Sequence, residues 1–207
     1  MATKVPRSAS YDELVAASRP RKRGPSPKPS PRKYRWQDPS GKKFTAAGIL
    51  FYDDEGIWVI GETEKNGIVY NDIGGKYMFE DGNIWTTIRR ELTEETYGLC
   101  DMLVREIEEL AKKYPPVAIN GHDSIPTYMC LVVPLSDIPK DRLNLDPAAF
   151  TRRRDITLQE NPDIPSHYYS PVLLTKLRYD DIRNKIKDVG FRLKRVLSMS
   201  SVMMERM

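Results

Sequence analysis

The sequence of 207 residues predicts an α/β fold on the basis of three patterns. Residues 44–62 read as two apolar strands joined by an Asp-Asp-Glu-Gly turn, which is typical of a β-hairpin. Residues 83–97 carry apolar side chains at the spacing of an amphipathic helix. Residues 125–135 are apolar at nearly every position, which indicates a central strand buried on both faces. Strands and helices therefore share one chain that is long enough for a single ordinary domain with extensions.

The helix predicted over residues 83–97 has clear start and stop signals. Asn83 or Asp81 can cap its first turn, because short polar side chains accept hydrogen bonds from free backbone N–H groups there. Gly98 suits the left-handed residue that ends many helices. One stripe of this helix is expected to anchor it to the sheet and consists of Ile84, Ile88 and Leu92.

Four further segments complete the central part of the chain. Residues 67–73 (GIVYNDI) predict a third strand that runs into two glycines. Residues 101–114 predict a second amphipathic helix, which ends before two prolines. Residues 136–166 are rich in Pro and Asp and predict a loop with ambiguous short strands. Residues 170–177 (SPVLLTKL) fit either a strand or the entry into a helix.

Apolar residues also recur with a heptad-like spacing near the carboxyl terminus, which predicts a helical extension over about 179–204. Gly190 and Ser200 interrupt this pattern. Such a seam can dock on its own domain, which we expect, or form a homodimer. The seam consists of Ile182, Ile186, Val189, Leu193 and Val196.

The amino-terminal segment differs in composition from the rest. Residues 1–43 hold twelve Lys and Arg against three Asp and Glu, together with seven of the 16 prolines. Such a segment has little apolar surface to offset the entropy of ordering, so we predict a disordered basic arm. The arm fits a nuclear-localisation or nucleic-acid-binding patch, and the alternative is a merely solubilising tail.

The bulk composition limits the cellular context. The first residues contain no apolar segment of the kind found in secretion signals, and no apolar run is long enough for a membrane helix. Two cysteines, Cys100 and Cys130, are too few for a disulfide framework. We therefore expect an intracellular protein, cytoplasmic or nuclear, with no membrane partner.

Three carboxylates on the helix over 83–97 suggest chemistry. Glu91, Glu94 and Glu95 are spaced so that they share one helical face, where like charges repel. No lysine stands between Lys76 and Lys112 to offset them, although a solvated helix face would normally include some. Hard carboxylate oxygens suit Mg²⁺ or Mn²⁺, so we expect the three to converge on a metal ion. Arg90, four residues before Glu94, can fix a carboxylate by a charge-assisted hydrogen bond.

The stretch from Gly74 to Leu99 (GGKYMFEDGNIWTTIRRELTEETYGL) resembles the signature of the Nudix hydrolase superfamily, G-x5-E-x7-R-E-U-x-E-E-x-G-U with U apolar. The resemblance covers roughly residues 44–178, but it is specific only within this stretch. Two extra residues lie outside the Arg90–Glu95 core, one before the helix and one in its last turn. The first leaves open whether Glu80 or Asp81 is the first acidic residue of the signature.

This resemblance implies a fold, a reaction and roles for individual residues. It implies an α/β/α sandwich with a mixed sheet over 44–178, flanked by the arm at 1–43 and the extension at 179–207. The implied reaction is attack of water on the pyrophosphate of a nucleoside diphosphate linked to a moiety X. Metal binding is assigned to Glu91, Glu94 and Glu95 with the backbone of Gly74 or Gly75, and Lys76 belongs to the same glycine-glycine-lysine element.

Within that scheme Glu91 orients or deprotonates the water, and Arg90 holds the carboxylates while pairing with Glu80 or Asp81. Many relatives use a further acidic residue from a downstream loop. Our candidate is Glu160, with Asp155 and Asp163 as rivals, although an ordinary loop charge is the simpler explanation of Glu160. His122 and His167 are loop histidines that could contact substrate, and His167, Tyr168 and Tyr169 could stack on a nucleobase.

The sequence is also compatible with two alternative functions. A basic arm suits an RNA-bearing substrate, and the segment after the signature is loosely similar to the mRNA-decapping Nudix enzymes of large DNA viruses, which release m7GDP from capped RNA. Alternatively, the shifted spacing has spoiled the site, and the protein is a non-catalytic Nudix-fold component whose arm binds nucleic acid.

Overall fold

The computed structural model describes residues 36–38, 41–120, 126–163, 171–184 and 186–207. These residues belong to one compact unit, Arg32–Met207. The disorder predicted for the arm concerns residues that lie almost entirely outside this described part.

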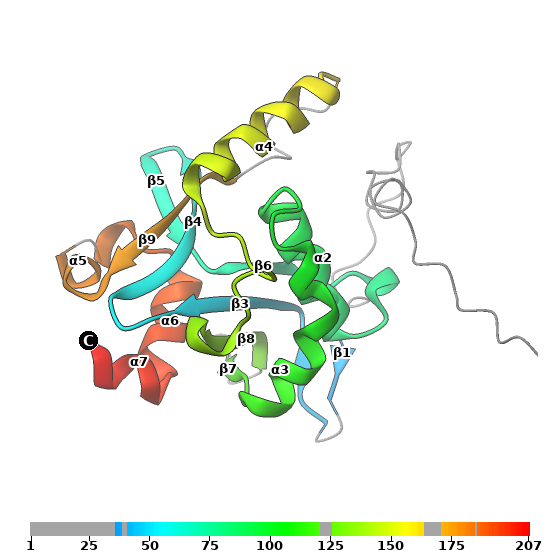
Figure 1. The fold of residues 1–207 in the computed structure, drawn as a ribbon. Helices are drawn as coiled ribbons and strands as arrows, with labels where there is room; N and C mark the ends of the chain where they lie inside the picture. The colour runs from blue at the N-terminus through cyan, green and yellow to red at the C-terminus, as the bar shows by residue number, and fades with distance from the viewer. Residues whose placement is uncertain (1–35, 39–40, 121–125, 164–170, 185) are drawn as a thin grey trace, which may run out of the picture. The chain divides into compact units, whose positions relative to one another are not determined.

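A seven-stranded mixed sheet forms the centre of this unit (Figure 1). Its main path runs β5 (Gly67–Asn71), β4 (Gly56–Glu64), β3 (Ala46–Tyr52), β8 (Pro126–Pro134) and β7 (Val117–Asn120). β6 (Ile73–Lys76) pairs with the first half of β3, and β9 (Pro171–Arg178) pairs with β4. β3 and β8 are parallel, whereas β3 and β4 form the antiparallel hairpin predicted from the sequence.

Alternation of side chains along β3 divides the core into two layers. Ile49 and Phe51 belong to a buried cluster with α2 (Ile84–Glu95) and α3 (Ile107–Lys113) on one face of the sheet. Leu50 belongs to a second cluster with α6 (Phe191–Met199) and α7 (Ser201–Arg206). Successive residues of a strand point to opposite faces, so the sheet lies between two layers of helices. The α/β/α sandwich predicted from the sequence is confirmed.

α2 is held on the sheet by the stripe that its sequence predicts. Ile84, Ile88 and Leu92 are each 0% exposed, and burial of one such side chain contributes roughly 1.5–3 kcal/mol. The cap is Asn83, whose Oδ1 accepts a hydrogen bond from Thr86 N at 2.9 Å.

The carboxyl end of α2 differs by one residue from the prediction. Tyr97, rather than Gly98 alone, adopts a positive φ of 52°, and Gly98 follows with 79°. Gly98 N donates to Thr93 O at 2.9 Å, as in a Schellman turn. The Tyr97 ring packs edge-on against Phe150, and its hydroxyl donates to Pro171 O at 2.8 Å. These contacts hold the extra residue of the motif in a conformation that is uncommon outside glycine.

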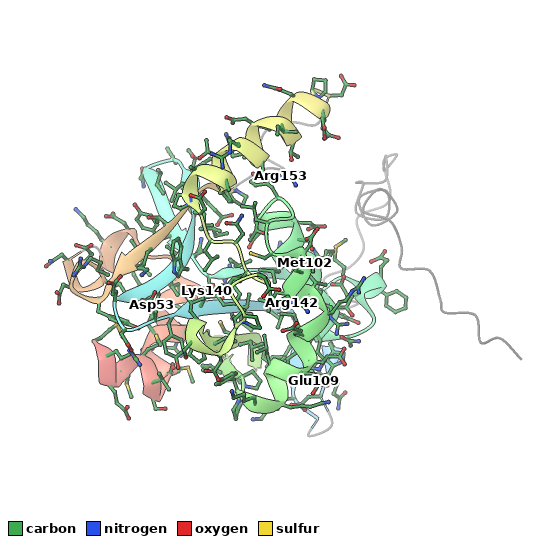
Figure 2. The ribbon with its side chains drawn as sticks, viewed as in Figure 1. Asp53, Met102, Glu109, Lys140, Arg142 and Arg153 are labelled. Atoms are coloured by element: carbon green, nitrogen blue, oxygen red, sulfur yellow. The ribbon has the colours of Figure 1, made fainter. Side chains whose placement is uncertain are left out.

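The loop prediction for residues 136–166 is wrong over much of its length. α4 (Pro147–Glu160) is a 14-residue helix capped by Asp146 and extending away from the sheet (Figure 1). Phe150 is its buried residue, whereas Arg153, labelled in Figure 2, is exposed. With so little of its surface buried, the helix shows no amphipathic period from which it could have been predicted.

Other elements refine the predictions. The segment over 101–114 begins as a 3₁₀ helix, η2 (Asp101–Glu106), before continuing as α3. Residues 170–177 are strand rather than helix, as β9. The carboxyl-terminal segment is not one helix but α5 (Tyr179–Asn184), a short 3₁₀ turn, α6 and α7. Several members of the predicted seam are buried within the chain itself, namely Ile182, Val189, Leu193 and Val196.

A two-stranded hairpin precedes the main sheet. β1 (Trp36–Gln37) pairs with β2 (Lys43–Phe44), and the Trp36 and Phe44 rings lie 6.1 Å apart. Trp36, Gln37 and Lys43, predicted as part of the arm, thus belong to strands. None of the helices that the structure describes has both the length and the apolar character required to span a bilayer.

Candidate active site

The site is built where α2 crosses the glycine strand β6. Gly74 and Gly75 pair with Gly48 and Ala47 of β3, which fixes their position at the centre of the sheet. A Cβ atom on Gly75 would overlap the carboxylate of Glu91, so a side chain here would displace that carboxylate from the strand. The double glycine therefore brings the charged face of α2 against the strand backbone.

Arg90 is the hub of the charged face of α2. Its Nε donates to Asp81 Oδ1 at 3.0 Å and its Nη2 to Asp81 Oδ2 at 3.2 Å, a bidentate pair. Its Nη1 donates to Glu91 Oε1 at 2.6 Å and to Glu94 Oε2 at 3.0 Å. Nη2 also donates to the backbone oxygen of Lys76 at 2.8 Å, which ties α2 to the end of β6.

The structure distinguishes the two candidates for the acidic partner of Arg90. Asp81 is buried and accepts further hydrogen bonds from Met78 N and Thr87 Oγ1, each at 2.9 Å. Burial acts to raise its pKa, but these bonds and the Arg90 charge hold the pKa of Asp81 below its ordinary value. Glu80 is exposed. Asp81 is thus the residue that fixes Arg90, and the extra residue of the motif lies in the turn between them.

Glu95 has a different partner from the other two carboxylates. Its Oε2 accepts a hydrogen bond from Gly74 N at 2.6 Å. Glu94 is exposed, whereas Glu91 is buried beside Arg90. One helical turn therefore presents three carboxylates in three environments.

The prediction that these three carboxylates converge is not met in this arrangement. Within the described ranges, no group of three or more His, Cys, Asp or Glu side chains is placed to hold a metal ion. The physical reason is that Arg90 takes up oxygens of both Glu91 and Glu94, while Glu95 turns toward Gly74. The donor types still fit Mg²⁺ or Mn²⁺, and Glu94, being exposed, can leave Arg90 by a change of rotamer.

The electrostatics of the site favour uptake of positive charge. Burial raises the pKa of Glu91, and the nearby Glu94 charge adds to this while Arg90 opposes it. Burial also raises the pKa of Glu95 well above its ordinary value, with a further contribution from Glu91. Arg192 acts in the opposite direction on both groups. A divalent cation would favour the ionised forms of these carboxylates.

The remaining predicted site residues are not brought to this face by any described contact. The Lys76 side chain is exposed, although its backbone oxygen binds Arg90. Glu160 is exposed at the last position of α4, and its rivals Asp155 and Asp163 are exposed as well. His122, His167, Tyr168 and Tyr169 lie outside the described residues.

Sequence reasoning missed a second charged group next to the same strand. Asp72, fully buried between β5 and β6, accepts a hydrogen bond from Arg192 of α6. Tyr128 of β8 also donates to Asp72. Asp72 stands inside the predicted strand over 67–73, where it breaks the strand in two, and a charged residue at that position was the available signal.

Comparisons with known proteins do not assign this chain to a family. No model of a known protein family matches the sequence, and no curated protein matches it. Among solved structures, the chain is similar to a NUDIX hydrolase from Nitrosomonas europaea, at 13% identity and a TM-score of 0.37. That likeness covers 79% of this chain and 86% of the other. The assignments below therefore depend on the geometry of this chain rather than on a relative.

Proposed function

We propose that this chain is a Nudix-type hydrolase that cleaves the pyrophosphate linkage of a nucleoside diphosphate joined to a moiety X. The observation that carries the proposal is the Arg90 hub: one guanidinium bound to Asp81, Glu91 and Glu94 on a helix pressed against Gly74-Gly75. Three carboxylates around one guanidinium leave negative charge uncompensated, which a purely structural network would not need.

The chain's own residues have distinct tasks in this proposal. Asp81 fixes Arg90, and Arg90 orients Glu91 and Glu94 through one nitrogen. Gly74 N holds Glu95 beside the strand. Mg²⁺ or Mn²⁺ held by Glu91, Glu94 and Glu95 would neutralise phosphate charge and acidify a water. Glu91, buried beside Arg90, would orient or deprotonate the attacking water.

The test is a substrate screen with a matched pair of variants. Nucleotide sugars, dinucleoside polyphosphates, nucleoside diphosphates and capped RNA are incubated with Mg²⁺ or Mn²⁺, and the products are separated by ion-exchange chromatography. Glu94→Gln is expected to lose roughly 10²-fold or more in kcat while staying folded by circular dichroism. Glu109→Gln is the control, because Glu109 (labelled in Figure 2) also pairs with a cation on its own helix, Lys112, but lies on α3.

Two results would contradict the proposal. The first is a wild-type protein that hydrolyses none of these substrates with either metal. The second is equal activity of Glu94→Gln and Glu109→Gln, because the carboxylate on α2 would then have no special role.

Among the substrates of the screen, capped RNA tests the decapping alternative. We infer this alternative from the basic amino-terminal arm, whose cations would bind phosphates outside the site. Deletion of residues 1–35, which spares the β1–β2 hairpin, should weaken m7GDP release and leave hydrolysis of small nucleotides unchanged. Equal loss on both kinds of substrate would argue against a role for the arm in RNA binding.

A non-catalytic function is the second candidate, because the three carboxylates are not assembled around one point in the described structure. In that case the protein would bind nucleic acid in a salt-dependent manner without hydrolysing any pyrophosphate. Fluorescence anisotropy with labelled RNA and DNA at two salt concentrations, beside the substrate screen, separates the two functions.

A further inference from the structure

A second buried charged network lies next to the glycine strand β6. It is formed by residues of β8, α6 and the junction of β5 and β6, not by the residues of the Arg90 hub. Arg192 Nε donates to Asp72 Oδ1 at 2.8 Å, and its Nη2 donates to Asp72 O at 3.0 Å. The other carboxylate oxygen accepts from the Tyr128 hydroxyl and from Cys130 Sγ, the latter at 3.4 Å. The Arg192 guanidinium also stacks 4.8 Å from the centre of the Tyr128 ring.

This network is in direct contact with the strand that carries Gly74. A Cβ atom added to Gly74 would lie 2.6 Å from the Tyr128 hydroxyl, and one added to Gly48 would lie 2.9 Å from Asp72 Oδ2. Both glycines are therefore needed for the network to approach. On its other side, Gly74 N donates to Glu95. A continuous path of contacts leads from Arg192 through Asp72 and Tyr128 to Gly74 and Glu95.

The start of α6 is itself fixed to the sheet, so Arg192 has a defined position. Gly190 N donates to Tyr70 O at 2.8 Å, and Val189 forms a parallel bridge with Tyr70. Leu193 and Val196, the next inward-facing residues of α6, are each 0% exposed. Helix α6 therefore places the Arg192 guanidinium at the junction of β5 and β6.

We propose that Arg192 is a positioning residue of the candidate active site: by holding Asp72 and Tyr128, it sets the position of the Gly74 N–H that binds Glu95. α6 is then part of the site rather than an appended helix. The importance of Glu95 for catalysis rests on the proposed function, but its placement by Gly74 does not. Partners that orient ligand residues in this way typically contribute 10–100-fold to metal affinity or activity.

The test compares two arginines of the same helix. Arg192→Met removes the network's cation, whereas Arg195→Met removes an exposed cation three residues later. The first readout is the Gly74 amide proton in the ¹H–¹⁵N spectrum of the metal-free protein, because hydrogen bonding to a carboxylate shifts this proton downfield. The second is Mn²⁺ affinity measured by electron paramagnetic resonance.

We expect Arg192→Met to move the Gly74 amide upfield and Arg195→Met to leave it unchanged. Mn²⁺ affinity is compared in Tyr128→Phe, which should weaken binding about tenfold, because Arg192→Met also removes a positive charge that acts on Glu91 and Glu95. If Arg192→Met does not fold, Tyr128→Phe replaces it, because that change removes one hydroxyl and keeps every charge. It is expected to move the same resonance in the same direction.

A folded Arg192→Met with the wild-type Gly74 resonance would overturn the proposal, and so would a folded Tyr128→Phe with the wild-type resonance and wild-type Mn²⁺ affinity. The amide readout requires neither substrate nor metal. Absence of hydrolysis by the wild type would therefore count against the proposed function alone, while the Gly74 resonance would still decide the role of Arg192.

Discussion

Arg90 and Arg192 hold buried aspartates on either side of one glycine strand, yet their surroundings differ in charge. Arg90 binds Asp81 with Nε at 3.0 Å and shares the rest of its guanidinium with Glu91 and Glu94. Arg192 binds Asp72 with Nε at 2.8 Å and stacks on the neutral ring of Tyr128, and its charge also opposes the rise in pKa of Glu95. Arg192 is hydrogen-bonded to one carboxylate, whereas Arg90 shares one positive charge among three carboxylates, so the hub at Arg90 has an excess of negative charge. Excess charge, rather than burial, therefore marks the face where a cation and a phosphate could bind.

The largest expected effect is on the free energy of unfolding. It tests whether the ion pair of Arg90 with Asp81 stabilises the fold, as we expect of the pair between Arg192 and Asp72. Arg90→Met leaves the Asp81 carboxylate buried without its counterion, so the free energy of unfolding should fall by roughly 3 kcal/mol. Urea denaturation at pH 7 measures this. Lys112→Met, which breaks an exposed ion pair with Glu109, is the control and should change the free energy of unfolding little, because solvent screens this pair. Equal losses in the two variants would mean that Arg90 is not needed to hold Asp81.

The second prediction concerns the pH dependence of folding stability. It tests whether the carboxylates of α2 carry an excess of negative charge. The pKa of Asp81 is lowered in the folded protein, so its stabilising contribution is present above its unfolded pKa and is lost as the pH falls through its folded value. The pKa of Glu95 is raised, so its contribution is present below its unfolded pKa and is lost as the pH rises through its folded value. Ionised Glu95 thus lowers the stability of the metal-free protein at pH 7.

Glu95→Gln should accordingly raise the urea midpoint at pH 7, and the gain should shrink as the pH falls toward about 4.3, the ordinary pKa of glutamate. Glutamine keeps an oxygen that can accept from Gly74 N. Glu109→Gln, at an exposed position, serves as the control. A lower midpoint for Glu95→Gln at pH 7 would show that the hydrogen bond outweighs the charge.

The smallest effect concerns the extra residue at the end of the helix that carries Arg90. Tyr97→Phe removes the hydroxyl that donates to Pro171 O but keeps the ring packed on Phe150. We expect a loss of about 1 kcal/mol in unfolding free energy, with the Gly74 amide resonance unchanged. A shift of that resonance would mean that the end of α2 also controls the placement of Glu95.

What could be predicted from the sequence was local. The cap at Asn83, the apolar stripe of α2 and the contact of Arg90 with Glu94 follow from spacing within one helix. The partner of Arg90 could not be chosen in advance, because Glu80 and Asp81 are adjacent and only the turn decides which side chain is buried.

Two features escaped prediction for different physical reasons. α4 buries little beyond Phe150, so it lacks the alternation of buried and exposed side chains that reveals most helices. Arg192 meets Asp72 across a long stretch of sequence, and the position of α6 depends on the backbone of β5 rather than on any local signal. The convergence of the three carboxylates was expected from helical spacing, which does not include the competition of Arg90 for their oxygens.

The pairing of β4 with β9 has a consequence for how the chain acquires its structure. Gly56 lies opposite Arg178, and β9 runs directly into the helices that lead to Arg192. Contacts between distant segments form late, because the intervening loop must first be closed. During synthesis, the β3–β4 hairpin and α2 emerge long before their partners, so we expect the nascent chain to display the carboxylate helix while its supporting arginine has yet to be made.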